Sequence, residues 1–452
     1  MTDSDIGDLL AARLSAVFGE DVRVEDLRRL TAGANSETWS FTAHRTAGVS
    51  RLILRRQPGA MHGPLGMTRE SEAISAAAKA GVPVPTVVEF SDDAAALGAP
   101  YLVCEHIDGE TIPRKLLRDD RYAQARTGMA AELGRTLARI HSIPLSAVPA
   151  LQSGVRSGLD ELRQSYLDLD TPSAVTEIAL AALSMYQPEP VGETVVHGDF
   201  RNGNLLISDS GLEAVLDWEL THIGDPREDL GWLLVKCWRF GTAPEVGGFG
   251  TVDDLLDGYA EVAGVRPDIE AVRWWQLYRT VWWSIVCAQM AQRHLSGGQR
   301  SVELAAIGRR VCEQEHDILL ALGRPATAVP DTPAATTEPG LHGQPTAAEL
   351  VNAVSEWLRT TVMPDAAAGS TRFEARVAAN VLDIVERELA AGDIPLDRRR
   401  AALEELGFES ETDLAIELRA GRANPRDPRI IAVVRASVTE RLLVANPRYL
   451  EQ

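Results

Sequence analysis

Residues 195–218 read VVHGDFRNGNLLISDSGLEAVLDW, and most of the expected fold and chemistry follows from them. Two apolar runs flank an Asp-Ser-Gly turn at 209–211, which predicts a β-hairpin. Antiparallel pairing across the turn places Asn204, just before the first strand, beside Asp217, just after the second. Asp199 precedes them in the adjoining loop. We therefore expect three oxygen-bearing side chains near one end of a hairpin.

These side-chain types predict phosphoryl transfer. One amide oxygen and one carboxylate suit Mg²⁺ when nucleotide phosphates and water complete its octahedron, so Asn204 and Asp217 are the expected metal ligands. A separate carboxylate can accept the hydroxyl proton of an attacking acceptor, which makes Asp199 the expected catalytic base. On the alternative interpretation, Asp199 and Asp217 are ordinary surface-turn acids and His197 is a packed loop histidine.

The pattern H-G-D-x-x-x-x-N, followed by a strand that ends in hydrophobic-Asp-Trp, resembles the catalytic and metal-binding loops of the aminoglycoside phosphotransferase/choline kinase-like family. The resemblance covers about residues 20–325 and implies ATP and Mg²⁺ as cofactors. It implies that His197 braces the loop and that Arg201 places a cation on the transferring phosphate. A solvated surface arginine is the alternative role for Arg201.

The same resemblance implies a phosphate-covering loop near the N-terminus. The stretch LTAGANSET at 30–38 matches it, with Gly33, Asn35 and Ser36 as the expected nucleotide-binding residues. Small residues there let backbone N–H groups approach phosphate oxygens.

A strand cation should contact the α- and β-phosphates, and a helix glutamate should hold it. The family typically has lysine at this position, whereas this chain has LILRR at 52–56 and no lysine nearby. We expect Arg55 to be the cation and Glu70 its partner. Alternation places Arg55 and Arg56 on opposite faces of the strand without deciding which face meets ATP, so Arg56 is the alternative. Arginine is planar and bidentate, so it does not replace lysine without consequence.

The stretch YLVCEHIDG at 101–109 resembles the family's hinge, which implies that Glu105 and His106 lie beside the adenine edge. Downstream, Asp229 follows the metal loop, and we expect it to cap backbone N–H groups of the catalytic loop.

The composition limits the partners that we expect. The chain of 452 residues carries 65 acidic and 45 basic side chains, a formal charge of −20, which argues against a nucleic-acid partner. Lysine occurs only at Lys79, Lys115 and Lys236, so phosphate handling falls largely to arginine. An acidic N-terminus, widely spaced cysteines and the lack of a long apolar run predict a cytoplasmic protein without a membrane contact.

The sequence predicts an α+β, protein-kinase-like bilobal fold followed by an all-α C-terminal domain. The expected limits are an N-lobe at 1–107, a C-lobe at 108–324, a Pro/Thr/Ala linker at 325–345 and a helical domain at 346–452. Strands are expected at 22–30, 37–43, 51–56, 87–90 and 101–105, after a helix at 6–18. Four C-terminal helices are expected at 347–362, 372–390, 411–419 and 428–444, with caps at Thr346, Thr371, Ser410 and Asp427.

The acceptor follows less directly from the residues. Tryptophans gather between 232 and 283, where core packing is the default and an aromatic acceptor pocket the alternative. The upstream and catalytic motifs look closest to the branch of kinase-like modules associated with acyl-CoA dehydrogenases, which implies a small-molecule hydroxyl acceptor such as a hydroxylated acyl compound. An aminoglycoside is the alternative acceptor. A nucleotide-binding, pseudokinase-like interaction protein is the alternative function, with the helical C-terminal domain a candidate surface for a protein partner or self-association.

Overall fold

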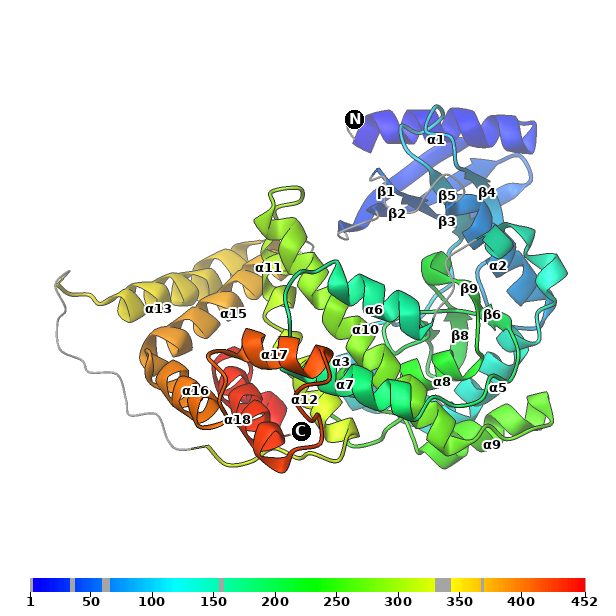
Figure 1. The fold of residues 1–452 in the computed structure, drawn as a ribbon. Coiled ribbons are helices and arrows are strands. Elements are labelled where there is room, and N and C mark those ends of the chain that lie inside the picture. Colours follow the sequence, from blue (N-terminus) through cyan, green and yellow to red (C-terminus); the bar gives the residue numbers. More distant parts are fainter. Residues whose placement is uncertain are drawn as a thin grey trace. The chain divides into compact units, whose positions relative to one another are not determined.

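The computed structural model describes residues 3–32, 37–58, 66–153, 158–329, 343–366 and 370–451. The chain forms two compact units: the first comprises Met1–Ser157 and Glu189–Val272, and the second comprises Gly158–Pro188 and Arg273–Gln452. Figure 1 follows the chain from its strand-rich start to its helical end. None of the helices within the described residues is both long and apolar enough to cross a membrane.

An antiparallel five-stranded sheet, ordered β1-β2-β3-β5-β4, opens the first unit. Its strands are β1 (Arg23–Ala32), β2 (Glu37–Arg45), β3 (Gly48–Arg56), β4 (Val87–Ser91) and β5 (Tyr101–Glu105). All five expected strands are therefore confirmed. Alternating side chains give the sheet two covered faces: Leu52 and Leu54 pack in one core with α1 (Asp3–Phe18), while Leu102 and Cys104 pack in another with α2 (Gly66–Lys79).

The rest of the first unit is mostly helical and carries two short strand pairs. Its helices are α3 (Pro113–Arg118), α4 (Ala123–Arg126), α5 (Met129–His141), α8 (Arg227–Leu233) and α9 (Val252–Ala263). The strand pairs are β6 (Thr194–Val196) with β9 (His222–Gly224), and β7 (Leu205–Ile207) with β8 (Leu212–Val215). The second pair is the predicted hairpin.

The second unit is built from helices in the part that the structure describes. They are α6 (Leu159–Leu167), α7 (Ala174–Met185), α11 (Val302–Gly308), α12 (Val311–Ala321), α13 (Ala347–Trp357), α14 (Met363–Asp365), α15 (Ser370–Ala391), α16 (Ile394–Glu405), α17 (Glu411–Arg419) and α18 (Pro428–Ala445). Helix α10 (Ile269–Leu295) begins in the first unit and continues into the second. One hydrophobic core joins α7, α10 and α12 to α17 and α18.

The C-terminal helices largely match the expectation. Thr346, Ser410 and Asp427 each cap a helix, as predicted. Thr371 does not, because α15 already begins at Ser370 and Thr371 lies inside it. Helix α16 is absent from the prediction. It starts after a left-handed Gly392 without a side-chain cap, although Asp393, Pro395 and the acidic Asp397 of its first turn are start signals. The expected limits of the lobes, linker and C-terminal domain stay predictions, and residues 330–342 lie outside the described residues.

Candidate active site

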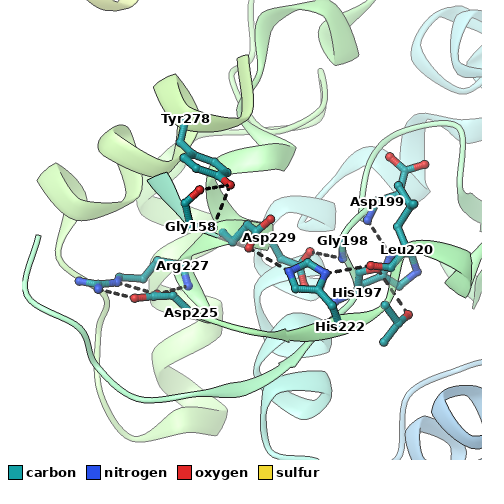
Figure 2. A network of polar contacts seen from close by, with 12 residues as sticks. Gly158, His197, Gly198, Asp199, Leu220, His222, Asp225, Arg227, Asp229 and Tyr278 are labelled. Carbon is teal, nitrogen blue, oxygen red and sulfur yellow. Dashed lines mark hydrogen bonds and ion pairs between the residues drawn. The ribbon is translucent and has the colours of Figure 1, made fainter. Parts of the chain in front are cut away.

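The loop between β6 and β7 is held by a buried carboxylate. Gly198 has a φ of +80°, and a Cβ there would lie 2.4 Å from the carbonyl oxygen of Leu220, so the turn requires glycine. The carboxylate of Asp229 accepts hydrogen bonds from the backbone N–H groups of His197 (2.7 Å) and Gly198 (2.9 Å), as Figure 2 shows. Burial raises the pKa of Asp229, but the hydrogen bond and charge of His141 outweigh it and the net pKa is lowered. Asp229 is therefore the predicted loop cap.

His197 braces this loop as a neutral ring. Its Nε2 lies 3.1 Å from the carbonyl oxygen of Leu216, and its Nδ1 accepts the backbone N–H of Asp199 at 3.2 Å. A proton on Nε2 alone satisfies both contacts. Burial lowers the pKa of His197, although neighbouring carboxylates oppose the shift. These contacts fix the backbone just before Asp199, the expected catalytic base.

Three donors orient the carboxylate of Asp199. Its Oδ1 accepts hydrogen bonds from Nε1 of Trp232 (2.9 Å) and Nε of Arg201 (3.0 Å). Its Oδ2 accepts a hydrogen bond from Nδ2 of Asn204 at 2.6 Å. Because both oxygens accept hydrogen bonds, the carboxylate has one defined orientation. Hydrogen bonds to a carboxylate are stronger than those between neutral groups.

Arg201 lies between this carboxylate and an aromatic pair. Its guanidinium carbon is 4.3 Å from the ring centroid of Trp238, which meets Trp232 edge to face at 5.0 Å. The Arg201 side chain is part-exposed. The arrangement holds a cation beside Asp199 while leaving part of it accessible.

The hairpin brings the two expected metal ligands together. The backbone N–H of Leu216 donates to the carbonyl oxygen of Asn204 at 2.8 Å, so Asn204 and the residue after Leu216, Asp217, lie at the same end of the strand pair. The Asn204 amide nitrogen donates to the backbone oxygen and to Oδ2 of Asp199, which leaves the amide oxygen as the atom able to bind a cation. Asp217 has a left-handed φ of +65° and a part-exposed carboxylate. Such a pair of hard oxygen donors fits Mg²⁺.

Arg55 connects the sheet to this metal-ligand pair. It forms an ion pair with the buried Glu70 of α2, and its Nη2 lies 3.2 Å from Oδ1 of Asp217 and 3.5 Å from Oε2 of Glu219. Burial lowers the pKa of Arg55, but these carboxylates outweigh it and raise the pKa overall. Burial also leaves the pKa of Glu70 raised, although Arg55 opposes the shift. The predicted strand cation and helix glutamate are thus in contact.

Arg56, the alternative cation, faces the other side of the sheet. Its Nη1 lies 3.1 Å from Oε2 of Glu37, and its guanidinium carbon is 5.6 Å from the ring centroid of Trp39. Trp39 belongs to the core that contains α1. Of the two arginines, Arg55 is therefore the one next to Asp217, an expected metal ligand.

Of the remaining expected nucleotide-binding residues, the structure describes Glu105 and His106. Gly33, Asn35 and Ser36 lie outside the described residues. In the hinge, the backbone N–H of Glu105 donates to the carbonyl oxygen of Thr86 (2.9 Å), and that of His106 donates to the carbonyl oxygen of Arg51 (3.0 Å). An adenine base would therefore have to bind other groups of Glu105 and His106 than these two N–H groups.

Two residues of the site are not predicted from the sequence. Glu219 follows Asp217 by two residues, and an acid so close to a predicted metal ligand was a usable signal. Trp232 lies 33 residues beyond Asp199, among tryptophans whose default role is packing. Only the fold brings its indole N–H to the carboxylate.

Residues 26–275 match the family described as the phosphotransferase enzyme family. The chain belongs to this family. Residues 365–449 match a second family, described as a domain of unknown function, DUF6285. Membership confirms the predicted enzyme class, phosphotransferase, and supports transfer to a small molecule.

The chain is also similar to parts of longer curated proteins. The chain is 30% identical to acyl-CoA dehydrogenase family member 10 of Mus musculus over 48% of this chain and 22% of that protein. It is 27% identical to acyl-CoA dehydrogenase family member 11 of Gallus gallus over 54% of this chain and 33% of that protein. These matches span a third or less of the relatives' own length.

The fold prediction is confirmed by a protein of Ralstonia eutropha assigned to the aminoglycoside phosphotransferases. Its crystal structure is 20% identical to this chain, with a TM-score of 0.55 over 70% of this chain and 98% of that one. The protein-kinase-like architecture is thereby shown.

Proposed function

We propose that this protein transfers the γ-phosphoryl group of ATP to a hydroxyl of a small molecule, with Mg²⁺ bound by Asn204 and Asp217. The observation that carries the proposal is the orientation of the Asp199 carboxylate. It accepts hydrogen bonds from three side chains, one of which is that of Asn204, an expected metal ligand. The acceptor oxygen would form the new bond to phosphorus, the bond from phosphorus to the β–γ bridging oxygen would break, and Asp199 would take the hydroxyl proton.

The other side chains supply positioning and charge. Arg55, held by Glu70, would contact the α- and β-phosphates, and the accessible part of Arg201 would face the transferring phosphate. Bound Mg²⁺ would offset the charge that develops on the phosphate oxygens. We propose Gly33, Asn35 and Ser36 as backbone donors to the phosphates, and Glu105 and His106 as neighbours of the adenine.

We propose a hydroxylated acyl compound as the acceptor class. The support is the match to two acyl-CoA dehydrogenase family members, in both of which the matching segment is a minor part of a longer protein. An aminoglycoside remains the alternative acceptor.

Asp199→Asn tests the proposed base. The variant keeps the shape of the side chain and removes its ability to accept a proton, so we expect turnover to fall at least 100-fold while ATP affinity stays within about twofold. Formation of ADP from ATP is measured with hydroxy acids, hydroxyacyl-CoA thioesters and aminoglycosides as acceptors. Asp209→Asn, in the exposed turn of the same hairpin, is the matched control. Normal turnover in Asp199→Asn would show that Asp199 is not the base.

A second candidate function is nucleotide binding without catalysis. The observation in its favour is the contact of Arg55 with Asp217 at 3.2 Å, which engages one oxygen of an expected metal ligand. Thermal shift with ATP, with and without Mg²⁺, separates the two candidates when combined with the acceptor panel. Stabilisation that needs Mg²⁺ and comes with ADP release supports the kinase, whereas Mg²⁺-independent stabilisation without turnover on any acceptor supports the binding protein.

A further inference from the structure

A cavity of about 320 Å³ lies among helices of the second unit. Its wall includes Val311 of α12, Leu396 of α16 and Val444 of α18, which make much of the lining apolar. Arg399 of α16 and Arg441 of α18 also line it. The volume is at the lower end of the range for sites that hold small molecules, roughly 300–1,000 Å³.

The polar side of the cavity is a lattice of ion pairs from four helices. Nη1 of Arg441 lies 3.2 Å from Glu315 of α12, and Nη2 lies 3.3 Å from Glu411 of α17. Nη1 of Arg399 lies 3.1 Å from the same Glu411. The two arginines are thus fixed side by side by a shared carboxylate.

Within this lattice the positive groups are the accessible ones. The side chains of Arg399 and Arg441 are 31% and 35% exposed, whereas those of Glu315 and Glu411 are 3% and 15% exposed. Nε of Arg441 is buried and has no hydrogen-bond partner among the described residues. Burial also raises the pKa of Glu315 against the attraction of Arg441, which makes this carboxylate easier to neutralise.

A second cavity, of about 280 Å³, adjoins the same lattice and is also lined by Val311, Glu315, Arg399 and Arg441. Both arginines can therefore be reached from either cavity. Two further ion pairs balance their own charges at the first cavity: Arg309 with Glu388, both exposed, and Glu440 of its lining with Arg398 at 3.1 Å.

We propose that the second unit binds a small organic anion, with its carboxylate or phosphate group on Arg399 and Arg441 and its apolar body against Val311, Leu396 and Val444. The guanidinium fork matches both anionic groups in geometry. All residues that line this site belong to the second unit, whereas Asp199, Asn204 and Asp217 belong to the first.

Isothermal titration calorimetry of the full chain tests the site with three probes that each contain six carbons: hexanoate, hexyl phosphate and hexylamine. We expect saturable binding of at least one of the two anions and none of the amine. Preference for hexanoate or hexyl phosphate identifies the anionic group. Arg399→Gln should weaken anion binding about tenfold or more, because a charge-assisted hydrogen bond is lost.

Arg400→Gln is the matched control, since Arg400 is the next residue on α16 and, among the described residues, forms its ion pair with the exposed Asp397. It should bind like the unmodified protein. If Arg399→Gln fails to fold, Ala391→Leu decides, because it narrows the cavity without changing a charge. The proposal would be overturned if hexylamine bound as well as the anions, or if neither anion bound. It would also be overturned if Arg400→Gln lost as much anion binding as Arg399→Gln, or if anion binding were unchanged both in a folded Arg399→Gln and in Ala391→Leu.

Discussion

At the scale of single residues, the proposed catalytic carboxylate depends on a neighbour that is distant in the sequence. The indole N–H of Trp232 and the guanidinium of Arg201 donate to the same oxygen of Asp199. The guanidinium also rests on Trp238, so its position is fixed from two sides. The orientation of Asp199 therefore depends on an indole as much as on charge.

Trp232→Phe should slow turnover without weakening ATP binding. The phenyl ring keeps most of the packing, but Asp199 loses one donor, and a hydrogen bond worth about 1 to 1.5 kcal/mol corresponds to roughly a tenfold loss in kcat. Steady-state kinetics with varied ATP checks this expectation. Trp274→Phe is the control, because that indole donates to the backbone of Leu183 in the second unit. An equal loss in both variants, or a rise in the KM for ATP with kcat unchanged, would contradict it.

His197 should make the stability of the protein depend on pH. Burial lowers the pKa of His197 in the folded state. Below about pH 6.5 the unfolded state therefore binds a proton on His197 that the folded state does not bind. Stability should therefore fall as the pH drops through this range, by up to about 1.4 kcal/mol per pH unit from this group.

His197→Gln, whose amide can still donate toward Leu216, should reduce that slope. Urea unfolding of both proteins at about pH 7 and pH 5.5 measures the difference. Parallel loss of stability in the two proteins would show that His197 does not titrate across the transition.

At the scale of elements, local patterns predicted the strands, the hairpin and most helices, because periodicity and caps are local signals. They could not choose between Arg55 and Arg56, since that choice depends on which face of β3 meets α2 and Asp217. They also missed α16, whose start lacks a side-chain cap. The long-range part of the site, from Trp232 to Asp199, has no local signal at all.

Helices α5 and α9 cross at glycines. A Cβ on Gly258 would lie 2.2 Å from the carbonyl oxygen of Ala131, and one on Gly134 would lie 2.1 Å from that of Leu255. Gly258→Ala should therefore lower the free energy of unfolding by about 2 to 4 kcal/mol, because the backbone at the helix crossing must move to make room for the Cβ. The better helix propensity of alanine does not offset this cost. Chemical denaturation measures this cost.

Gly264→Ala provides the comparison, because Gly264 ends α9 with a φ of +74° and open space around its Cβ position. Its cost should be about 1 kcal/mol, from the left-handed backbone alone. Equal costs for the two substitutions would show that the helix crossing is not as close as the structure has it.

At the scale of the whole chain, the C-terminal helices belong to the same core as helices that precede the expected linker. Leu442 of α18 and Ile178 of α7 lie in one hydrophobic cluster. Side chains of α12 also accept hydrogen bonds from residues that follow α18. The Tyr449 hydroxyl donates to Asp317 at 2.6 Å, and the Asn446 amide donates to Glu313 at 2.8 Å. The proline-rich linker marks a break in composition, whereas the packing of the second unit continues across it.

Leu442→Ala should therefore loosen both sides of that core. Removing a fully buried leucine side chain costs about 2 to 5 kcal/mol, and a shared core transmits the loss to every helix that it supports. Hydrogen exchange should accelerate in α7 as well as in α18, while Leu443→Ala, at the adjacent exposed position, should change neither. Acceleration confined to residues 346–451 would instead mean that the C-terminal helices open as a domain of their own, as the sequence composition predicts.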